Sequence, residues 1–459
     1  MRDNLLPTVE GFARMDLPAS VIESRLYGAL TKDQELLSIL QSVREVVATL
    51  AATTDRTVPN YTDHTVKHMD ALWGVADQIF TVEESNLLTP AEAFLLGVSF
   101  YLHDVGMAYA ATSEGLDILK CSEPFKSFMA SISEAERKLP SSIARAVAIS
   151  VRRLHADAAR ELAINEIPGS KGIYIFQAKT IRDVWGTTCG EIASSHHWTI
   201  AQLESHFGLR GDVPLPGGRR ADLLYVSSCL RLVDYAHINR ERASTMARAL
   251  RFPLGTDSLV HWLAQEHIDG PLRDDGAYLV YRAAKPIGDV EAWWLFYEMM
   301  SGLDAEIRGV TRILDQRHGN YKRLSLRGVR GATSPDDAAA FIPPLGFLPI
   351  EVNLRTGSID KLVELLAGET LYGPNPMAAV RELIQNARDA VMLKSEVAVD
   401  PADRAALSLP ITINLTTKGP APLLQVIDYG IGMTKLVITD LPDFNSVKLL
   451  DDPVCERLS

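Results

Sequence analysis

The stretch PAEAFLLGVSFYLHDVGMA (residues 90–108) decides how the first three-quarters of the chain fold. Thr89 stands in the capping position of a predicted helix, Pro90 opens its first turn, and apolar residues run on to Leu102. His103 and Asp104 follow directly. Charge next to a protein core needs a partner or a metal ion, so this pair marks a candidate site.

Helical spacing of apolar residues extends outward from this stretch, from about residue 20 to residue 325. Residues 61–80 and 221–235 predict two further strong helices. The first of them carries one apolar stripe, formed by Val66, Met69, Leu72, Val75 and Ile79. We find no alternating strand pattern of comparable quality here, and residues 211–220 form a Pro/Gly loop. The sequence therefore predicts an all-α domain over residues 1–330.

Further histidines and one aspartate lie on the other predicted helices of this domain. They are His64 and His68 in YTDHTVKHMDAL, His155 in RRLHADAARE, His196 and His197 in IASSHHWTI, and Asp234 in CLRLVDYAHI. A single histidine on a helix is usually structural. An adjacent His-Asp pair at the end of a buried helix is harder to explain in that way.

The order His68, His103-Asp104, Asp234 resembles the H…HD…D signature of the HD superfamily of phosphohydrolases. The resemblance implies that these four side chains converge from different helices on one divalent cation: Mn, Fe, Ni, Zn or Mg. Such a metal lowers the pKa of a bound water and holds the phosphoryl oxygens of a substrate. The chain lacks the GYP motif of the cyclic-dinucleotide branch, which disfavours that substrate.

The same resemblance implies a second metal ion, because His155 and His196 or His197 fall where binuclear HD proteins place further ligands. Asp104 would then bridge two ions. The alternatives are that His196 and His197 contact a substrate phosphate or form a surface pair. For His64 three roles are left open: support of a metal ligand, contact with a substrate phosphate, or a purely structural role.

Four basic residues are candidates for binding a substrate phosphate: Arg231, one turn before Asp234, and Lys67, Arg152 and Arg153. The alternative for each is a solvated position, since basic residues on amphipathic helices mostly lie in water.

The Pro/Gly-containing stretch RGATSPDDAAAFIPPLG at residues 330–346 predicts an interdomain linker, and the domain division places this linker at 331–350. After it, the pattern of apolar residues changes. Helices are predicted at 358–366 and 377–393, followed by strands at 411–415 and 423–427. We therefore expect a mostly α-helical protein in which residues 351–459 form an incomplete α+β sandwich.

The helix AAVRELIQNARDAV (378–391) and the turn VIDYGIGM (426–433) resemble the ATP-binding domain of gyrase, histidine kinases, MutL and the chaperone of the same fold, the GHKL class. The resemblance implies that Glu382 orients the attacking water, Asn386 holds Mg²⁺, and Asp428 accepts a hydrogen bond from adenine. The other residues of the motif are Asp389, one turn beyond Asn386, and Gly430 and Gly432, which let the backbone approach the nucleotide.

The sequence after Met433 contains no glycine, so it lacks the second Gly-rich turn expected to wrap the phosphates. We expect the ATP/Mg²⁺ site to be incomplete and its affinity to be poor. Either the chain is a truncated form of a longer protein, which we favour, or the half-domain is a docking surface.

Composition sets limits on partners and location. Lys+Arg 46 against Asp+Glu 58 gives a formal net charge of −12, which disfavours duplex nucleic acid as a partner. Scattered cysteines, no leader pattern and no long apolar run predict a cytoplasmic protein without a membrane span. A homo-oligomer is left open.

The leading hypothesis is a metal-dependent phosphohydrolase acting on a nucleotide or related phosphate ester, coupled to a nucleotide-binding module. A regulatory or antiviral role rests on analogy with fused proteins of this kind. The alternatives are a chaperone-like or signalling ATPase whose HD domain is a sensor or scaffold, and a pair of binding modules without catalysis.

Overall fold

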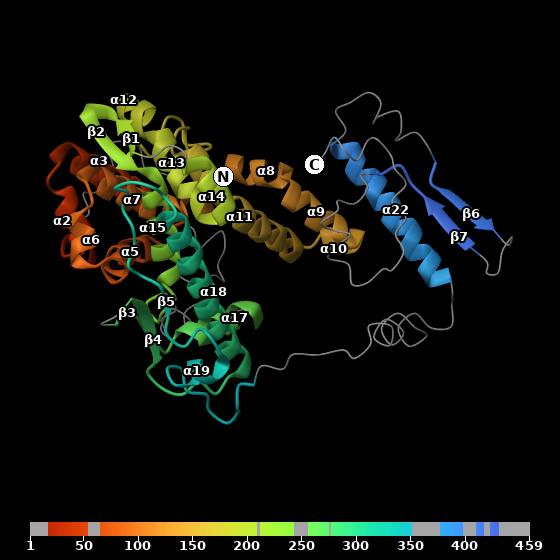
Figure 1. The fold of residues 1–459 in the computed structure, drawn as a ribbon. Coiled ribbons are helices and arrows are strands. Elements are labelled where there is room, and N and C mark those ends of the chain that lie inside the picture. The colour runs from red at the N-terminus through yellow and green to blue at the C-terminus, as the bar shows by residue number, and fades with distance from the viewer. Residues whose placement is uncertain are drawn as a thin grey trace. The chain divides into compact units, whose positions relative to one another are not determined.

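The computed structural model describes residues 17–53, 65–208, 212–242, 256–274, 277–350, 377–397, 410–416 and 423–430. The chain divides into two compact units, residues 1–351 and 352–459. The first unit is mostly helical (Figure 1). Its α-helices are α1 (Ala19–Ile22), α2 (Arg25–Leu30), α3 (Gln34–Ala51), α5 (Val66–Ile79), α6 (Val82–Asn86), α7 (Pro90–Leu102), α8 (Ser113–Cys121), α9 (Glu123–Ser131), α10 (Glu134–Arg137), α11 (Pro140–Leu162), α12 (Lys179–Ile181), α13 (Thr187–Ser194), α14 (Ile200–Phe207), α15 (Leu223–Ala236), α17 (Thr256–Gln265), α18 (Val290–Asp315) and α19 (Pro335–Ala339).

Helix α7 is the centre of this unit, as its apolar sequence predicts. Every residue from Ala91 to Leu102 is buried, and α2, α3, α5, α13 and α15 pack around the helix (Figure 1). A capping box closes its N-terminus: the backbone N–H of Glu92 donates to Thr89 Oγ1, and the Glu92 carboxylate accepts from the backbone N–H of Thr89. The helix thus carries its last residues, and His103 after them, into the interior.

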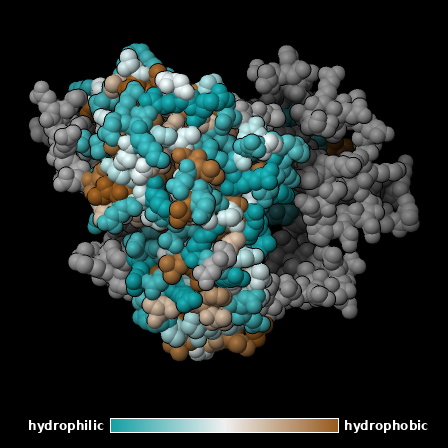
Figure 2. Space-filling model, turned by 60° about the vertical axis from the view of Figure 1, so that its left-hand side comes forward, coloured by the Kyte–Doolittle hydropathy of each residue, from teal (hydrophilic) through white to brown (hydrophobic). Residues whose placement is uncertain are grey.

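One segment of the described chain, Pro90–Ala111, is long and apolar enough to cross a membrane by length and composition. It comprises α7 and the short 3-10 helix η2 (Val105–Ala111), and 89% of its most apolar window is buried inside the protein. The segment therefore packs as the core helix of the unit. On the face drawn in Figure 2, hydrophilic residues dominate and hydrophobic ones occur in small groups.

A buried polar network ties three of the core helices together. The Arg44 guanidinium of α3 donates to both carboxylate oxygens of Asp70 on α5, at 2.8 and 2.7 Å. The Tyr101 hydroxyl of α7 donates to Asp70 Oδ1 at 2.9 Å. Asp70 lies two residues after His68 and Tyr101 two residues before His103. The network therefore fixes the parts of α5 and α7 that carry these histidines.

The first unit also contains strands, so the prediction of a purely helical domain is wrong in this respect. The Pro/Gly loop is a hairpin of β1 (Asp212–Leu215) and β2 (Arg219–Asp222), turned by Gly217 and Gly218, both with positive φ. A second sheet pairs β3 (Ile268–Arg273) antiparallel with β4 (Tyr278–Ala283), which runs parallel to β5 (Gly328–Val329). None of these strands exceeds 6 residues, too short for alternation to stand out from a helical background.

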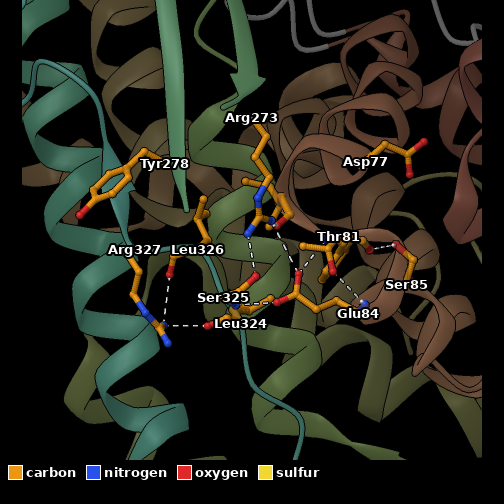
Figure 3. Close-up of polar contacts among 12 residues, drawn as sticks. Asp77, Thr81, Glu84, Ser85, Arg273, Tyr278, Leu324, Ser325, Leu326 and Arg327 are labelled. Carbon is orange, nitrogen blue, oxygen red and sulfur yellow. Dashed lines mark hydrogen bonds and ion pairs between the residues drawn. The ribbon is translucent and has the colours of Figure 1, made fainter. Parts of the chain in front are cut away.

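Polar contacts hold this sheet onto α6 and the end of α5, as Figure 3 shows. Glu84 of α6 accepts hydrogen bonds from the backbone N–H groups of Thr81 and Ser325. Arg273, at the end of β3, donates to Ser325 Oγ at 2.7 Å and to the carbonyl of Ile79. Segments far apart in the sequence are thereby joined into one body.

The predicted linker is also wrong for most of its length. Residues 330–342 pack onto the first unit: Ala338 and Ile342 are fully buried, and Trp293 Nε1 of α18 donates to the carbonyl of Ile342 at 2.6 Å. Proline and glycine suggested a linker here, but the apolar side chains between them enter the core. The first unit extends accordingly to residue 351.

The second unit contains one long helix and one hairpin in its described residues. Helix α22 (Met377–Val397) contacts β7 (Leu423–Ile427), and β7 pairs antiparallel with β6 (Thr412–Thr416). The helix-then-strand order agrees with the predicted order. The helix predicted at 358–366 lies outside the described residues.

Candidate metal centre

The first group of candidate ligands forms where three helices meet inside the first unit. His68 lies in the first turn of α5, whose N-terminus is capped by the Thr65 side chain. His103 and Asp104 follow α7, and Asp234 lies in the last turn of α15. All of the imidazole of His68 and of His103 is buried, and the Asp234 side chain is 20% exposed.

The four side chains converge, as the resemblance to the HD superfamily implies. His68 Nε2 lies 3.3 Å from His103 Nε2 and 3.4 Å from Asp234 Oδ1. His103 Nε2 lies 3.4 Å from the same oxygen and 3.2 Å from Asp104 Oδ2, which is 3.8 Å from His68 Nε2. We call His68, His103, Asp104 and Asp234 the first cluster.

The second group consists of His155 on α11 and His196 and His197 on the 3-10 turn η4 (Ser195–His197). His155 Nε2 lies 3.1 Å from His196 Nε2, and the rings of His155 and His197 are 4.4 Å apart between centroids. One ligand atom from each of these three residues lies within 4.8 Å of the others. We call these three residues the second cluster.

Asp104 connects the two clusters. Its Oδ2 faces His103 at 3.2 Å, and its Oδ1 faces His155 Nε2 at 3.4 Å. One carboxylate thus directs one oxygen to each cluster. This is the placement that a carboxylate shared by two cations requires.

The glycine two residues after Asp104 explains how His155 comes so close. A Cβ placed on Gly106 would lie 2.0 Å from the backbone carbonyl oxygen of His155, so only glycine fits between η2 and α11. The HDVG sequence therefore supplies two candidate ligands and also the close approach that brings α11 to them.

Backbone carbonyls fix the orientation of three of the imidazoles. The Nδ1 atoms of His103, His155 and His196 lie 3.0, 2.9 and 2.6 Å from the carbonyl oxygens of Phe100, Arg152 and Ala193, in each case three residues earlier. Each Nδ1 therefore carries a proton and donates it, which turns the Nε2 atom of each ring into the clusters. A metal-ligating histidine shows this arrangement.

His68 is oriented by another histidine, His237, which the sequence analysis did not single out. His237 follows α15, is 1% exposed, and places its Nδ1 2.8 Å from His68 Nδ1, with the two rings stacked at 5.0 Å. One of the two nitrogens donates and the other accepts. The only hint in the sequence is its position three residues after Asp234.

The electrostatics of the clusters call for a cation. Burial lowers the pKa of His103, but the carboxylates of Asp104 and Asp234 outweigh it and raise that pKa to about 10. Burial raises the pKa of Asp234, but the positive charge of His103 holds it well below its usual range. Two buried carboxylates thus retain a proton on the imidazole between them.

Two further imidazoles, those of His68 and His196, are neutral. Burial is the main cause of the lowered pKa of His68, to which the charge of Arg242 adds. Burial and the neighbouring charges of His103 and His155 lower the pKa of His196 to about 3. Neutral imidazoles with free lone pairs are the form that binds metals.

One oxygen of the first cluster has no hydrogen-bond donor among the described residues. Asp234 Oδ1 is buried, and its contacts among the described residues are ion pairs with His68, His103 and, at 3.9 Å, Arg242. A buried carboxylate oxygen in this state calls for a water molecule or a cation as its partner. Imidazole nitrogens with carboxylate oxygens suit Mn, Fe, Ni or Zn.

The predicted substrate-binding basic residues do not gather at the clusters. Lys67, Arg152 and Arg153 are exposed on the surfaces of their helices. Arg231 is buried and engages backbone carbonyls of η4 and the carboxylate of Glu306. His64 lies outside the described residues.

In the second unit, the predicted nucleotide-binding residues lie on α22 and in the turn after β7. Glu382, Asn386 and Asp389 are exposed on the helix. Asp428 Oδ1 accepts a hydrogen bond from the Gly430 backbone N–H at 2.9 Å. Gly432 lies outside the described residues.

The conformation of this turn depends on Gly430. A Cβ at Gly430 would lie 2.5 Å from the Ala390 backbone of α22, so glycine is needed for the turn to touch the helix. The turn and the helix that carry the predicted motif are therefore in contact.

One comparison with known proteins gives a match. Residues 58–309, more than half of the chain, match the HD-CE family. No curated protein and no solved structure matches the chain. The matched range includes every residue of both clusters.

Proposed function

Because the chain belongs to the HD-CE family, we propose that it is a metal-dependent phosphohydrolase that acts on a nucleotide or a related phosphate ester. One observation carries the proposal: Asp104 directs one oxygen to each of two histidine clusters, at 3.2 and 3.4 Å. A shared carboxylate between two imidazole groups fits a pair of divalent cations, and such pairs are frequent in hydrolases of phosphate esters.

The first ion would be held by His68, His103, Asp104 and Asp234, and the second by Asp104 with His155, His196 and His197. Bound divalent ions supply Lewis acidity, which makes water a better nucleophile and stabilises negative charge on phosphoryl oxygens. The preference of these N and O donors extends over several transition metals, so the metal is left open among Mn, Fe, Ni and Zn, with Mg as a further candidate.

The side chains of this protein contribute orientation and exclusion of solvent. Three Nδ1–H groups are held by carbonyls, so the imidazoles cannot rotate away from the centre. His197 is the exposed member of the second cluster, and we assign to it the contact with the substrate phosphate if it does not ligate the metal. Arg242, whose guanidinium lies 3.9 Å from Asp234 Oδ1, adds positive charge beside the first cluster.

We place the organic part of the substrate in a depression next to the second cluster. It has a volume of about 520 Å³ and is lined by Trp198, Ala201, Gln202, Ser205 and His206. Trp198 directly follows His197 in the chain, and its ring stacks on that of Phe207 with 5.7 Å between centroids. A base stacked on an aromatic ring gains about 1–3 kcal/mol, which favours a nucleotide as the substrate.

The test combines metal analysis with a substrate screen. Protein purified without chelator is analysed for bound metals, and then nucleotides and simple phosphate esters are screened for released phosphate. We expect metal-dependent hydrolysis that disappears in His103→Ala and persists in Glu382→Ala. Hydrolysis lost only in Glu382→Ala would assign the chemistry to the second unit and refute the proposal.

The second candidate function is a chaperone-like or signalling ATPase in which the HD domain is a sensor or scaffold. It is favoured by the contact of the Asp428 turn with α22, the helix of Glu382 and Asn386. We propose in addition that a GHKL-type nucleotide-binding module is coupled to the hydrolase. Titration with a non-hydrolysable ATP analogue, with and without Mg²⁺, tests both ideas, since no binding would contradict each of them.

A further inference from the structure

Arg231 of α15 makes an unusual set of contacts beside the second cluster. Its Nη1 lies 2.7, 3.0 and 2.6 Å from the carbonyl oxygens of Ser195, His196 and Trp198. Its Nε donates to Glu306 Oε1 of α18 at 2.6 Å. The Arg231 side chain is 9% exposed and that of Glu306 is 15% exposed.

These three carbonyls belong to the turn that carries the second cluster. Helix α13 ends at Ser194, and η4 follows it. The last carbonyls of a helix have no partner within the helix and carry partial negative charge, so a guanidinium beside them is stabilising. One Nη1 has two hydrogens and here serves three acceptors, so at least one hydrogen is shared.

Two of the guanidinium nitrogens of Arg231 are already bonded within the protein, which favours a structural role over substrate binding. Its Nε and Nη1 point to Glu306 and to the backbone of the turn. Glu306 in turn neutralises the guanidinium and fixes it against α18. The Arg231–Glu306 pair therefore fixes the backbone conformation of the turn.

We propose that Arg231, anchored by Glu306, is a positioning residue that holds the His196–His197 turn in register with the first cluster. The inference rests on the proposed metal centre and goes beyond it by assigning the device that sets the second site. Arg231 lies one turn before Asp234 on the same helix. Helix α15 thus presents a ligand to the first cluster and holds the backbone of the second, so the spacing between the two ions is set by one rigid element.

The turn must be positioned precisely because only one of the three histidines of the second cluster comes from a long helix. His155 comes from α11, but His196 and His197 come from a turn of three residues. Metal–ligand distances must be correct to about 0.2 Å. Without the three carbonyl contacts, the turn would be tied to α15 only by packing, including that of α13 and α14 on either side of it, whereas the members of the first cluster would keep their places at the ends of the core helices.

The experiment counts Mn²⁺ ions. Metal-free full-length protein is titrated with Mn²⁺, desalted and analysed for metal per chain, and the electron paramagnetic resonance spectrum reports whether two ions are coupled. The variants are Arg231→Met, which keeps the apolar stem without donors, and Arg231→Lys, which keeps the charge without the fork. The matched control is Arg219→Met, which removes an arginine paired with Asp33 and Glu35 and bonded to the Pro216 carbonyl.

We expect two coupled ions per chain in the wild type and in Arg219→Met. In Arg231→Met we expect one uncoupled ion, with the dissociation constant of the second raised about 10- to 100-fold, the usual effect of losing an outer-shell support. The affinity of Arg231→Lys for the second ion should lie between those of the wild type and Arg231→Met. Two ions bound with wild-type affinity in Arg231→Met would overturn the inference, and so would loss of both ions from a folded variant.

A second variant guards against a folding defect, because Arg231→Met leaves Glu306 without its partner. The double variant Arg231→Met with Glu306→Gln removes that charge, and we expect it to bind one ion as well. Recovery of two ions in the double variant would show that only the unpaired carboxylate mattered, and would refute the positioning role. A wild type that binds one ion overturns this inference and leaves the proposed hydrolase standing, whereas a wild type that binds none overturns both.

Discussion

The two clusters are built from similar side chains but on different supports. The first lies at the ends of three buried helices, α5, α7 and α15, which pack against one another. The second takes two of its three histidines from a short turn, η4, which is held by Arg231. One candidate centre thus combines residues fixed by the hydrophobic core with residues on a turn that is hydrogen-bonded to one buried arginine.

The difference predicts which perturbations separate the clusters. Damage to the core helices should affect folding and the first ion together. Damage to the turn should affect the second ion alone. Asp104 is the exception, because it serves both.

The largest effect is expected from Asp104→Ala, which removes the shared carboxylate. Both ions should be lost from the isolated protein, and hydrolysis should fall by at least about 10³-fold, since Asp104 directs one carboxylate oxygen to each cluster. Elemental analysis and phosphate release measure the two effects, and circular dichroism checks that the helices remain. Unchanged metal content in this variant would show that the ligand assignment is wrong.

Next in size is Asp70→Asn, which breaks the buried network behind the first cluster. It leaves the Arg44 guanidinium without a carboxylate, and removal of one partner of a buried ion pair costs about 3–5 kcal/mol. We expect a large loss of unfolding free energy in urea, with weaker binding of the first ion.

The matched control for this network is Tyr101→Phe, which removes one hydrogen bond to Asp70 and should cost about 1 kcal/mol. Equal stability of Asp70→Asn and the wild type would mean that the core does not support the first cluster through this network.

Gly106→Ala should disturb the second cluster from the other side. The added Cβ would meet the His155 carbonyl, so α11 must shift, and overpacking of this kind costs about 1–3 kcal/mol. We expect the second ion to bind more weakly and the first to remain. A matched control is Gly74→Ala on α5, where an added Cβ meets nothing within 4 Å. If the two variants bind metal alike, the close approach at Gly106 is not required.

The sequence predicted the first cluster better than its support. A buried helix ending in His103 and Asp104 follows from the apolar run before it, and the structure shows both. For Arg231 the sequence leaves open a contact with a substrate phosphate or a solvated position, because it shows only that the residue lies one turn before Asp234. Its true partners are backbone carbonyls of a turn about 35 residues away, and no pattern of side chains reveals a bond to a distant carbonyl.

The same reason explains the missed strands and His237. Strands β3 and β4 form a hairpin, and β5 joins β4 from far along the chain; each is too short for its own alternation to predict it. His237 lies in an irregular segment after α15, where helical periodicity no longer says which way a side chain points. Only the packed structure shows its ring stacked on that of His68.

His237→Phe tests the difference between the two clusters because it should weaken metal binding at the first cluster alone. Phenylalanine keeps an aromatic ring for stacking but removes the nitrogen that orients His68. Loss of such an outer partner lowers metal affinity about 10- to 100-fold, so we expect the first Mn²⁺ to bind more weakly by this factor while the second stays in place. His237→Gln, which restores a polar partner, should recover part of the affinity. Selective loss of the second ion would contradict the assignment.

The smallest effect is expected from Trp198→Ala, which tests the depression beside the second cluster. The Trp198 carbonyl is held by Arg231 whatever its side chain, so the turn and both ions should stay in place. Stacking of a base is worth about 1 kcal/mol at its lower limit, which corresponds to a roughly fivefold rise in KM for a nucleotide. Trp198→Phe should retain most of the binding. Pyrophosphate, which has no base, is the matched substrate, and its hydrolysis should not change. If the two substrates lose activity equally, Trp198 acts on the metal turn and not on a base, and the substrate must be sought on another face of the centre.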